Sequence, residues 1–191
     1  MKERGMIFNG EMVRAILDGR KTQTRRPVKV PHIDKDAMCE LSGNELAGEL
    51  LAGNYRNSPH GKPGDRIWVR ETWARYNIDQ DSHDMAYRAT PPADWPEEGR
   101  WRPSIHMPRW ASRLTLGITG VRVERLRDLS EDDAKSEGIT PPSGGVLPGW
   151  EYRINFRDLW MSIYGADNWE ANPWVWVIEF KVVPNVQDNP A

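Results

Sequence analysis

The stretch from residue 19 to residue 27 is constrained at both of its ends. Asn9 can cap a helix whose apolar residues between Met12 and Leu17 recur with a period of 3.6 residues. Gly19 suits the position just after a helix, and Pro27 favours an extended backbone before it. Between them lie one lysine, three arginines and two threonines, all outside the helix. Such a cationic stretch is either a solvated loop or the floor of a site for an anion or nucleic acid.

Charge is unevenly distributed along the chain. Residues 14–30 hold six basic residues and one acid, and residues 100–127 hold seven arginines and one acid. From Asp128 onward there are eleven acids and four bases. Two basic segments in an otherwise acidic chain indicate a local patch for an anionic partner. The alternative is that these arginines pair with the acidic C-terminal part.

The 191 residues are enough for one domain with a sizeable core, expected over residues 1–184. The chain has ten Trp and only three Phe, and its Trp residues serve either the core or a site for a flat ligand.

Cys39 is the only cysteine, which excludes an internal disulfide and fits a reducing, cytoplasmic location. No signal pattern or membrane-length apolar run is present, so we expect no membrane association. The four histidines lack metal-ligand spacing, so we expect no metal and no cofactor.

The sequence pattern predicts short strands and helices between long loops. Strands are expected at residues 6–8, 66–73, 85–88, 114–123 and 175–180, with Ile67 and Val69 on one side of theirs and Trp68 and Arg70 on the other. Helices are expected at residues 46–51, 131–137 and 152–164. The last has an apolar stripe made of Ile154, Leu159, Trp160 and Ile163. Insertions are expected at about 28–60, 77–110 and 140–150, and a flexible tail at 185–191.

A loop at residues 101–113 interleaves aromatic residues with arginines between prolines. This mixture suits base stacking together with phosphate contact.

Several motifs, taken in order, resemble the ASCH-domain family of the PUA-like superfamily. They are Gly-x-Lys-Thr-x-x-x-Arg from Gly19 to Arg26, the Lys-Pro-Gly-Asp turn at residues 62–65 before a strand, the helix at 131–137 capped by Ser130, and the closing Val-Ile-Glu-Phe at 177–180. The resemblance implies an α+β fold, a PUA-like mixed β-barrel flanked by helices, here with long loop insertions. It also implies a cleft for RNA, nucleotides or modified nucleosides. Longer Trp-rich members look like phage or prophage products.

Within this family the chain is similar to small bacterial N4-acetylcytidine amidohydrolases, although it is nearly twice their length. By motif position Lys21 is the implied base, Thr24 the nucleophile and Glu137 the proton relay. We expect further contacts to the nucleoside or nucleic acid from both basic segments and from the strand after residue 65: Arg20, Arg26, Trp68, Arg70, Arg109, Trp110 and Arg113.

Amide hydrolysis by Thr24 requires a group that takes its proton, and Lys21 serves only if it is partly neutral. Burial and the neighbouring arginines would lower the pKa of Lys21, whereas Glu137 would raise it. The sequence leaves open which effect prevails. In a regular strand Lys21 and Thr24 would point to opposite faces, so their convergence requires a turn or bulge.

Two alternatives use the same residues. One is a non-catalytic reader of RNA or modified DNA that binds through residues 21–26 and 101–113. The other is a ribonuclease, although no acid–base histidine pair is apparent in the sequence. RNA is favoured over DNA as the partner, and the sequence carries no signal for an oligomeric state.

Overall fold

The computed structural model describes residues 1–76, 84–140, 149 and 151–185. Its centre is a five-stranded sheet with the strand order β1-β3-β6-β7-β2. These strands are β1 (Glu3–Ile7), β2 (Gln23–Pro27), β3 (Arg66–Arg70), β6 (Thr115–Arg125) and β7 (Trp174–Val183). Strands β1 and β3 are parallel and the other pairs antiparallel. The α+β class is confirmed, but the described strands form an open sheet with β1 and β2 at its edges, not a closed barrel.

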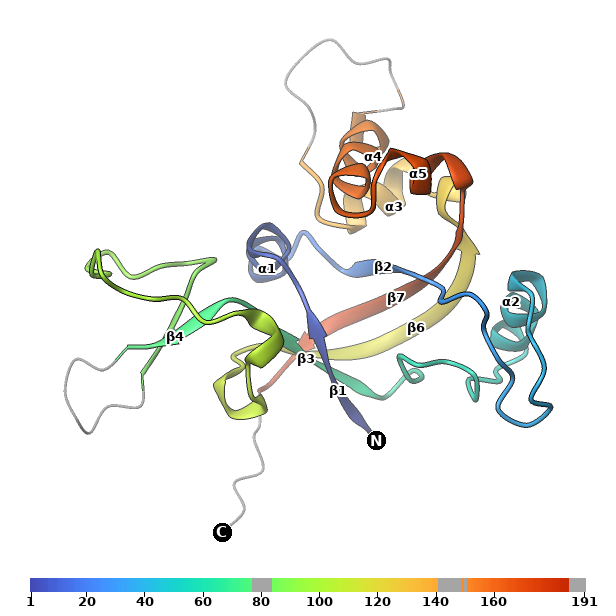
Figure 1. Ribbon diagram of the computed structural model, residues 1–191, viewed down its shortest axis with the longest axis horizontal. Helices are drawn as coiled ribbons and strands as arrows, with labels where there is room; N and C mark the ends of the chain where they lie inside the picture. Colours follow the sequence, from blue (N-terminus) through green and yellow to red (C-terminus); the bar gives the residue numbers. More distant parts are fainter. Residues whose placement is uncertain (77–83, 141–148, 150, 186–191) are drawn as a thin grey trace.

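Strands β6 and β7 are long and curved and form the centre of the sheet (Figure 1). Their register shifts between Ile118 and Gly120, which is a β-bulge, and bulges increase the local bend and twist of a strand pair. The bend carries the C-terminal end of β6 and the start of β7 toward α3 (Glu131–Ser136) and α4 (Glu151–Tyr164), so that side chains of β2, β6 and β7 can meet α3.

The two faces of the sheet bury different sets of residues, because successive side chains of a strand point to opposite faces. One face packs Val121, Trp176 and Ile178 against α1 (Gly10–Leu17) and α2 (Gly43–Leu51). The other packs Val175 and Val177 against the layer formed by α3 (Glu131–Ser136), α4 (Glu151–Tyr164) and α5 (Ala166–Ala171).

The helix before the basic stretch is confirmed, with both of its expected ends. The Asn9 side chain accepts a hydrogen bond from the Met12 N–H at 2.8 Å. Gly19 follows the helix with a φ of 76°, a left-handed conformation that glycine adopts without strain. The strand before it covers Glu3–Ile7 instead of residues 6–8, and Phe8 is a buried core residue.

The strand expected at residues 66–73 is divided in two. Strand β3 ends at Arg70, and β4 (Trp73–Arg75) leaves the main sheet to pair with β5 (Met85–Tyr87). The break lies at Glu71, whose buried carboxylate accepts two hydrogen bonds from Arg113. Before the break the expected sidedness of the strand holds, since Ile67 and Val69 are core residues.

Most of the expected helices are present, but their bounds or their exposed faces differ from the expectation. Helix α2 begins three residues earlier than expected because Ser42 and Glu45 form a capping box. Helix α5 was not expected. In α4, Trp160 is buried but Ile163 is 48 % exposed, because part of the expected apolar stripe lines a cleft and not the core. Short 3-10 helices lie at Ser104–His106, Arg109–Ala111 and Leu126–Asp128.

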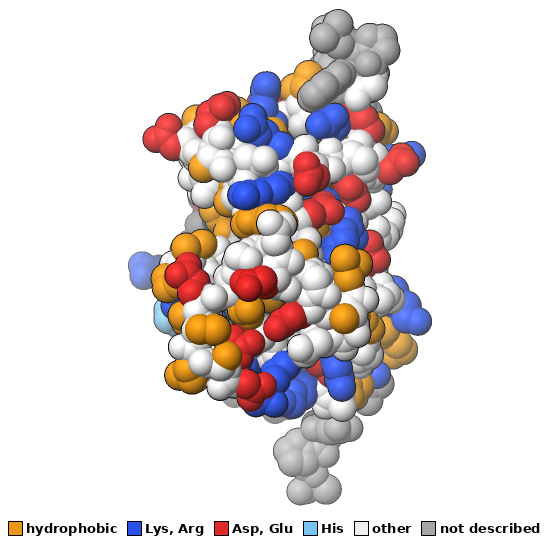
Figure 2. All heavy atoms as spheres, turned by 90° about the vertical axis from the view of Figure 1, so that its right-hand side faces the viewer, with side chains coloured by type: hydrophobic (Ala, Val, Ile, Leu, Met, Phe, Trp, Pro, Cys, Tyr) orange, Lys and Arg blue, Asp and Glu red, His pale blue; other side chains and the backbone are white. Residues whose placement is uncertain are grey.

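Parts of the expected insertions lie outside the described residues, as does most of the expected tail. Within the described part of the chain, no helix has the length and apolar character that a bilayer crossing requires. On the face of the molecule shown in Figure 2, basic and acidic side chains are intermingled and not gathered by sign.

Candidate functional site

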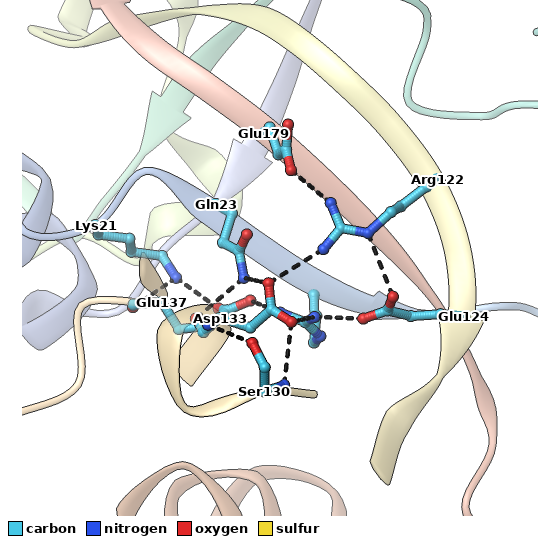
Figure 3. Close-up of polar contacts among 9 residues, drawn as sticks. Lys21, Gln23, Arg122, Glu124, Ser130, Asp133, Glu137 and Glu179 are labelled. Atoms are coloured by element: carbon cyan, nitrogen blue, oxygen red, sulfur yellow. Dashed lines mark hydrogen bonds and ion pairs between the residues drawn. The ribbon is translucent and has the colours of Figure 1, made fainter. Parts of the chain in front are cut away.

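Lys21 and Glu137 meet in the interior at the start of β2. Glu137 follows α3 as its C-cap, and the two residues form an isolated β-bridge. The Lys21 Nζ donates to the Glu137 Oε2 at 2.9 Å and to its backbone carbonyl at 3.0 Å (Figure 3). Both residues are buried. The structure therefore brings together two residues of the implied trio that are 116 positions apart.

Gly138 makes this approach possible. Its φ is 85°, and a Cβ at this position would lie 2.7 Å from the Ala15 Cβ and 2.9 Å from the Lys21 Cβ. Only glycine fits both the backbone conformation and the space beside Lys21.

Arg25 holds the second oxygen of the Glu137 carboxylate. Its Nη1 donates to Glu137 Oε1 at 3.0 Å, and its Nη2 lies 2.5 Å from Glu124 and 3.4 Å from Asp133. The Arg25 side chain is fully buried. Lys21 and Arg25 lie two strand periods apart, so both side chains face α3.

The ion pairs continue across the sheet as a network (Figure 3). Arg122 on β6 contacts Asp133 at 3.2 Å, Glu124 at 3.3 Å and Glu179 at 2.5 Å. Buried charges are tolerated when each is paired and hydrogen-bonded, since breaking one pair leaves a charge uncompensated. The network thus fixes the position of Glu137 through several strands.

Burial lowers the pKa of Lys21, and this effect prevails over the opposing influence of Glu137. Arg26 and Arg25 lower the pKa further, because a second positive charge nearby disfavours the protonated amine. The question that the sequence left open is answered in favour of a lysine that gives up its proton more readily than usual.

Thr24 lies on the other side of β2 from Lys21 and Arg25, next to Ile178 of β7. It is buried, and its hydroxyl is not among the hydrogen-bond partners of Lys21 or Glu137. Both hydrogen bonds of the Lys21 Nζ go to Glu137. Lys21 precedes β2, yet this does not bring its amine to the Thr24 hydroxyl.

A cavity of about 200 Å³ lies between β2 and α4, and we name it the β2–α4 pocket. One wall is polar and contains Thr24, Arg26 and Glu137. The opposite wall is apolar and belongs to α4: Phe156, Leu159, Trp160, Ile163 and Tyr164. The lining also includes Ile7, Asn9, Met12 and Arg25. Glu137 thus connects the pocket with Lys21, which is not one of the described lining residues.

A neighbouring cavity of about 340 Å³ shares Met12, Glu137 and Leu159 with this pocket. Arg20 lines it and donates to the Gly138 carbonyl at 2.8 Å. Ligand cavities commonly measure about 300–1,000 Å³, so the two adjoining spaces together suit a nucleoside-sized ligand.

Arg26 reaches from the pocket toward the other edge of the sheet. Its Nη2 donates to the Ile7 carbonyl at 2.7 Å, and its guanidinium lies over the Phe8 ring at 5.0 Å. Burial lowers its pKa. Its Nε has no hydrogen-bond partner among the described residues.

The remaining predicted ligand contacts lie elsewhere. Arg70 stacks on Trp68 at 4.6 Å on β3, and neither is among the described residues that line the β2–α4 pocket.

Arg109 pairs with Glu3 at 3.0 Å, and Arg113 with Glu71 at 2.9 Å. Trp110 is 49 % exposed and packs edge-on against Trp73. Nucleic-acid contact by these residues stays a prediction, since Arg109 and Arg113 already have structural partners.

Sequence reasoning expected Arg25 only as one of the neighbouring charges that lower the pKa of Lys21, and it missed both the contact of Arg25 with Glu137 and the α4 wall. The spacing of Arg25 from Lys21 was a usable signal for the former, because alternate residues of a strand share a face. For Trp160 and Tyr164 the apolar stripe gave the helix but not the surface against which it lies. Among the described residues, no group of three or more His, Cys, Asp or Glu is arranged to hold a metal ion.

No family model and no curated protein matches this chain. Solved structures that can be superposed on this chain include the hypothetical protein PH0355, with 15% identity and a TM-score of 0.42 over 95% of this chain and 99% of that one. The ASCH domain from Lactobacillus crispatus JV V101 has 13% identity and a TM-score of 0.43 over 95% and 79%. Protein EF3133 from Enterococcus faecalis V583 has 13% identity and a TM-score of 0.41 over 96% and 80%. Similarity this distant says nothing about the site, which rests on its own residues.

Proposed function

We propose that this protein binds a nucleoside, or a base of a nucleic acid, in the β2–α4 pocket and hydrolyses the amide of an N4-acylated cytidine. The observation that carries the proposal is the placement of Glu137. Its carboxylate is bonded to the buried Lys21, and the same residue lines the pocket together with Thr24. A proton can therefore pass between the pocket and a lysine with a lowered pKa.

The two walls of the pocket suit a flat heterocycle with a polar edge. Trp160 and Tyr164 lie 4.4 Å apart between ring centroids and contribute aromatic surface from α4. Stacking of a base on an aromatic side chain contributes about 1–3 kcal/mol. The base would lie against this wall, with its acylated amine toward Thr24 and Glu137.

In the proposed reaction the Thr24 hydroxyl attacks the acyl carbon, and its proton moves through Glu137 to Lys21. The guanidinium of Arg26 stabilises the negative oxygen of the tetrahedral intermediate. The bond between the acyl carbon and N4 then breaks, and the leaving amine takes the proton back from Lys21. Water hydrolyses the resulting Thr24 ester, which releases the carboxylic acid and restores the hydroxyl.

The test is incubation of the purified protein with N4-acetylcytidine, with cytidine release followed by chromatography. Lys21→Ala should reduce release at least a hundredfold, since general acid–base groups contribute about 10²–10⁴-fold. Lys181→Ala, which removes an exposed lysine of β7, is the matched control. Absence of cytidine release, or undiminished release by Lys21→Ala, would contradict the proposal.

A second candidate is recognition of a base without hydrolysis in the same pocket. It is favoured by one observation, that the Thr24 hydroxyl has no hydrogen bond to Lys21 or Glu137. This candidate predicts that cytidine and N4-acetylcytidine quench the fluorescence of the pocket tryptophan, Trp160, without turnover. For a longer RNA it predicts an affinity that falls steeply with salt, because phosphate contacts release counterions.

A further inference from the structure

A larger cavity, of about 540 Å³, adjoins the β2–α4 pocket on the other side of the β1–α1 junction. The two cavities share Ile7 and Asn9 as lining residues. We name it the Arg88 cavity; its lining runs from Ile7 to Glu11 and continues with Arg14, Glu71, Thr72, Arg88, Ala89 and Ser104. In Figure 1, α1 lies between the helical layer and the extension that carries β4. Both cavities have lining residues on this helix, Met12 in the β2–α4 pocket and Glu11 and Arg14 in the Arg88 cavity.

Two arginines give the Arg88 cavity its capacity for an anion. The Arg88 side chain is exposed and makes no hydrogen bond or ion pair with any described residue. Arg14 uses Nη1 to donate to the Ala89 carbonyl at 3.0 Å, which leaves other guanidinium N–H groups available. Thr72 and Ser104, which both carry a hydroxyl group, line the same space. Guanidinium groups match the oxygen geometry of phosphate, and hydroxyls add further donors.

The acids of this cavity do not cancel the arginines. The Glu71 carboxylate is already held by two hydrogen bonds from Arg113, at 2.9 and 3.0 Å. Glu11 is the one remaining acid among the described lining residues, against Arg14 and Arg88. The cavity therefore keeps a net positive charge, whereas the β2–α4 pocket next to it is mostly apolar on its α4 side.

We propose that the Arg88 cavity is a phosphate subsite: it binds a phosphate group attached to the nucleoside whose base occupies the β2–α4 pocket. This inference rests on the proposed function of that pocket and specifies its substrate as a phosphorylated nucleoside. The ribose spans the Ile7–Asn9 junction, and Arg88 contacts the phosphate oxygens with support from Arg14. A terminal phosphate monoester and an internal phosphodiester offer the same oxygens.

Binding of the unacylated product separates this inference from the reaction. Isothermal titration calorimetry compares cytidine with cytidine 5′-monophosphate and cytidine 3′-monophosphate on the wild-type protein, Arg88→Gln and Arg127→Gln. The Arg127 side chain is exposed and is not among the described lining residues of either cavity, so this variant removes the same charge elsewhere. We expect one monophosphate to bind at least tenfold more tightly than cytidine. Arg88→Gln should remove most of this difference and leave the affinity for cytidine unchanged.

Short oligoribonucleotides then distinguish the two sources of phosphate. A trinucleotide with its cytidine at a phosphorylated end presents a monoester, and one with the cytidine in the middle presents diesters alone. A preference for either, lost in Arg88→Gln and kept in Arg127→Gln, supports the subsite and identifies its ligand.

Equal affinity for cytidine and both monophosphates would overturn the inference, as would equal losses in Arg88→Gln and Arg127→Gln. If the phosphate preference depends on Arg88 but N4-acetylcytidine is not hydrolysed, the subsite stands and the proposed reaction fails. If N4-acetylcytidine is hydrolysed but no phosphate preference is found, the proposed reaction stands and the subsite fails.

Discussion

Arg25 binds the carboxylate oxygen of Glu137 that Lys21 leaves free. The Arg25 Nη1 lies 3.0 Å from Oε1 and the Lys21 Nζ 2.9 Å from Oε2, so one carboxylate serves two cations. This sharing divides the negative charge between them and limits how strongly Glu137 can hold the proton on Lys21. In the proposed reaction Arg25 would thus be a positioning residue, since it acts through Glu137.

Replacement of Arg25 by Gln should therefore raise the pKa of Lys21, because Glu137 would then pair with Lys21 alone. NMR titration of the Lys21 side chain measures this directly and does not depend on catalysis. The free energy of unfolding should fall by about 3–5 kcal/mol, the usual cost of breaking a buried ion pair. Arg127→Gln should change neither quantity, and an unchanged Lys21 titration in Arg25→Gln would show that the arginine is only structural.

The pH dependence of hydrolysis should follow the lowered pKa of Lys21. The base must be neutral, so kcat/KM should rise with pH and level off above an apparent pKa lower than the ordinary lysine value of about 10.5. Lys21→Arg keeps the positive charge but cannot lose its proton, and it should lack both the rise and the activity. A rate that is independent of pH in the wild-type protein would remove Lys21 from the role of base.

Gly138→Ala should destabilise the protein and reduce activity together, because the added Cβ would press on Ala15 and Lys21. Gly53→Ala is a matched control, since Gly53 also has a positive φ but no atom of the described residues lies within 4 Å of its Cβ position. The left-handed conformation alone costs about 1–2 kcal/mol for a non-glycine residue. Urea denaturation should show a loss in Gly138→Ala that exceeds the loss in Gly53→Ala, and equal losses would mean that the space beside Lys21 is not restrictive.

Stability in acid should depend on His60. Burial and the nearby Arg26 and Arg4 lower the pKa of His60 to about 4. The unfolded chain, with an ordinary histidine pKa of about 6.5, binds more protons between these values, so stability falls as the pH drops from 6.5 to 4. Over this pH range the free energy of unfolding should fall by about 1–3 kcal/mol. His60→Gln should flatten this part of a stability–pH curve from chemical denaturation, whereas His106→Gln, at an exposed position, should leave the curve unchanged.

Tyr164→Ala should weaken base binding through loss of stacking in the β2–α4 pocket. We expect a tenfold or larger rise in the Kd for cytidine, in line with about 1–3 kcal/mol per stacked base. Tyr164→Phe keeps the ring and should bind nearly as well. Ile105→Ala, at an exposed site outside the described pocket lining, serves as the control, and an equal effect in both would place the base elsewhere.

Local patterns predicted the elements of this fold well because caps, turns and periodicity are short-range signals. Asn9 and Gly19 each mark a helix end where expected. The contact between Lys21 and Glu137 was implied only by resemblance, since no local rule joins residues so far apart in the chain. Sequence alone could not give the position of α4 against β2, nor the carboxylate partners of Arg109 and Arg113, because these depend on how the sheet bends.

The strand alternation that separates Lys21 from Thr24 was foreseen and persists in the structure. In the proposed reaction, proton transfer between Lys21 and Thr24 therefore has to pass through Glu137, which contacts Lys21 and lines the same pocket as Thr24.

Among the strands that the structure describes, β2 pairs with β7 alone, and this has a consequence for the exchange of its amide hydrogens with solvent. The Thr22 carbonyl accepts from the Phe180 N–H and the Val28 N–H donates to Trp174, so the even-numbered residues of β2 bond to β7. The amides of Thr24 and Arg26 should exchange slowly, and that of Arg25, directed to the open edge, faster. A ligand in the β2–α4 pocket would lie against this edge, so selective slowing at Arg25 would report its arrival in the main chain itself.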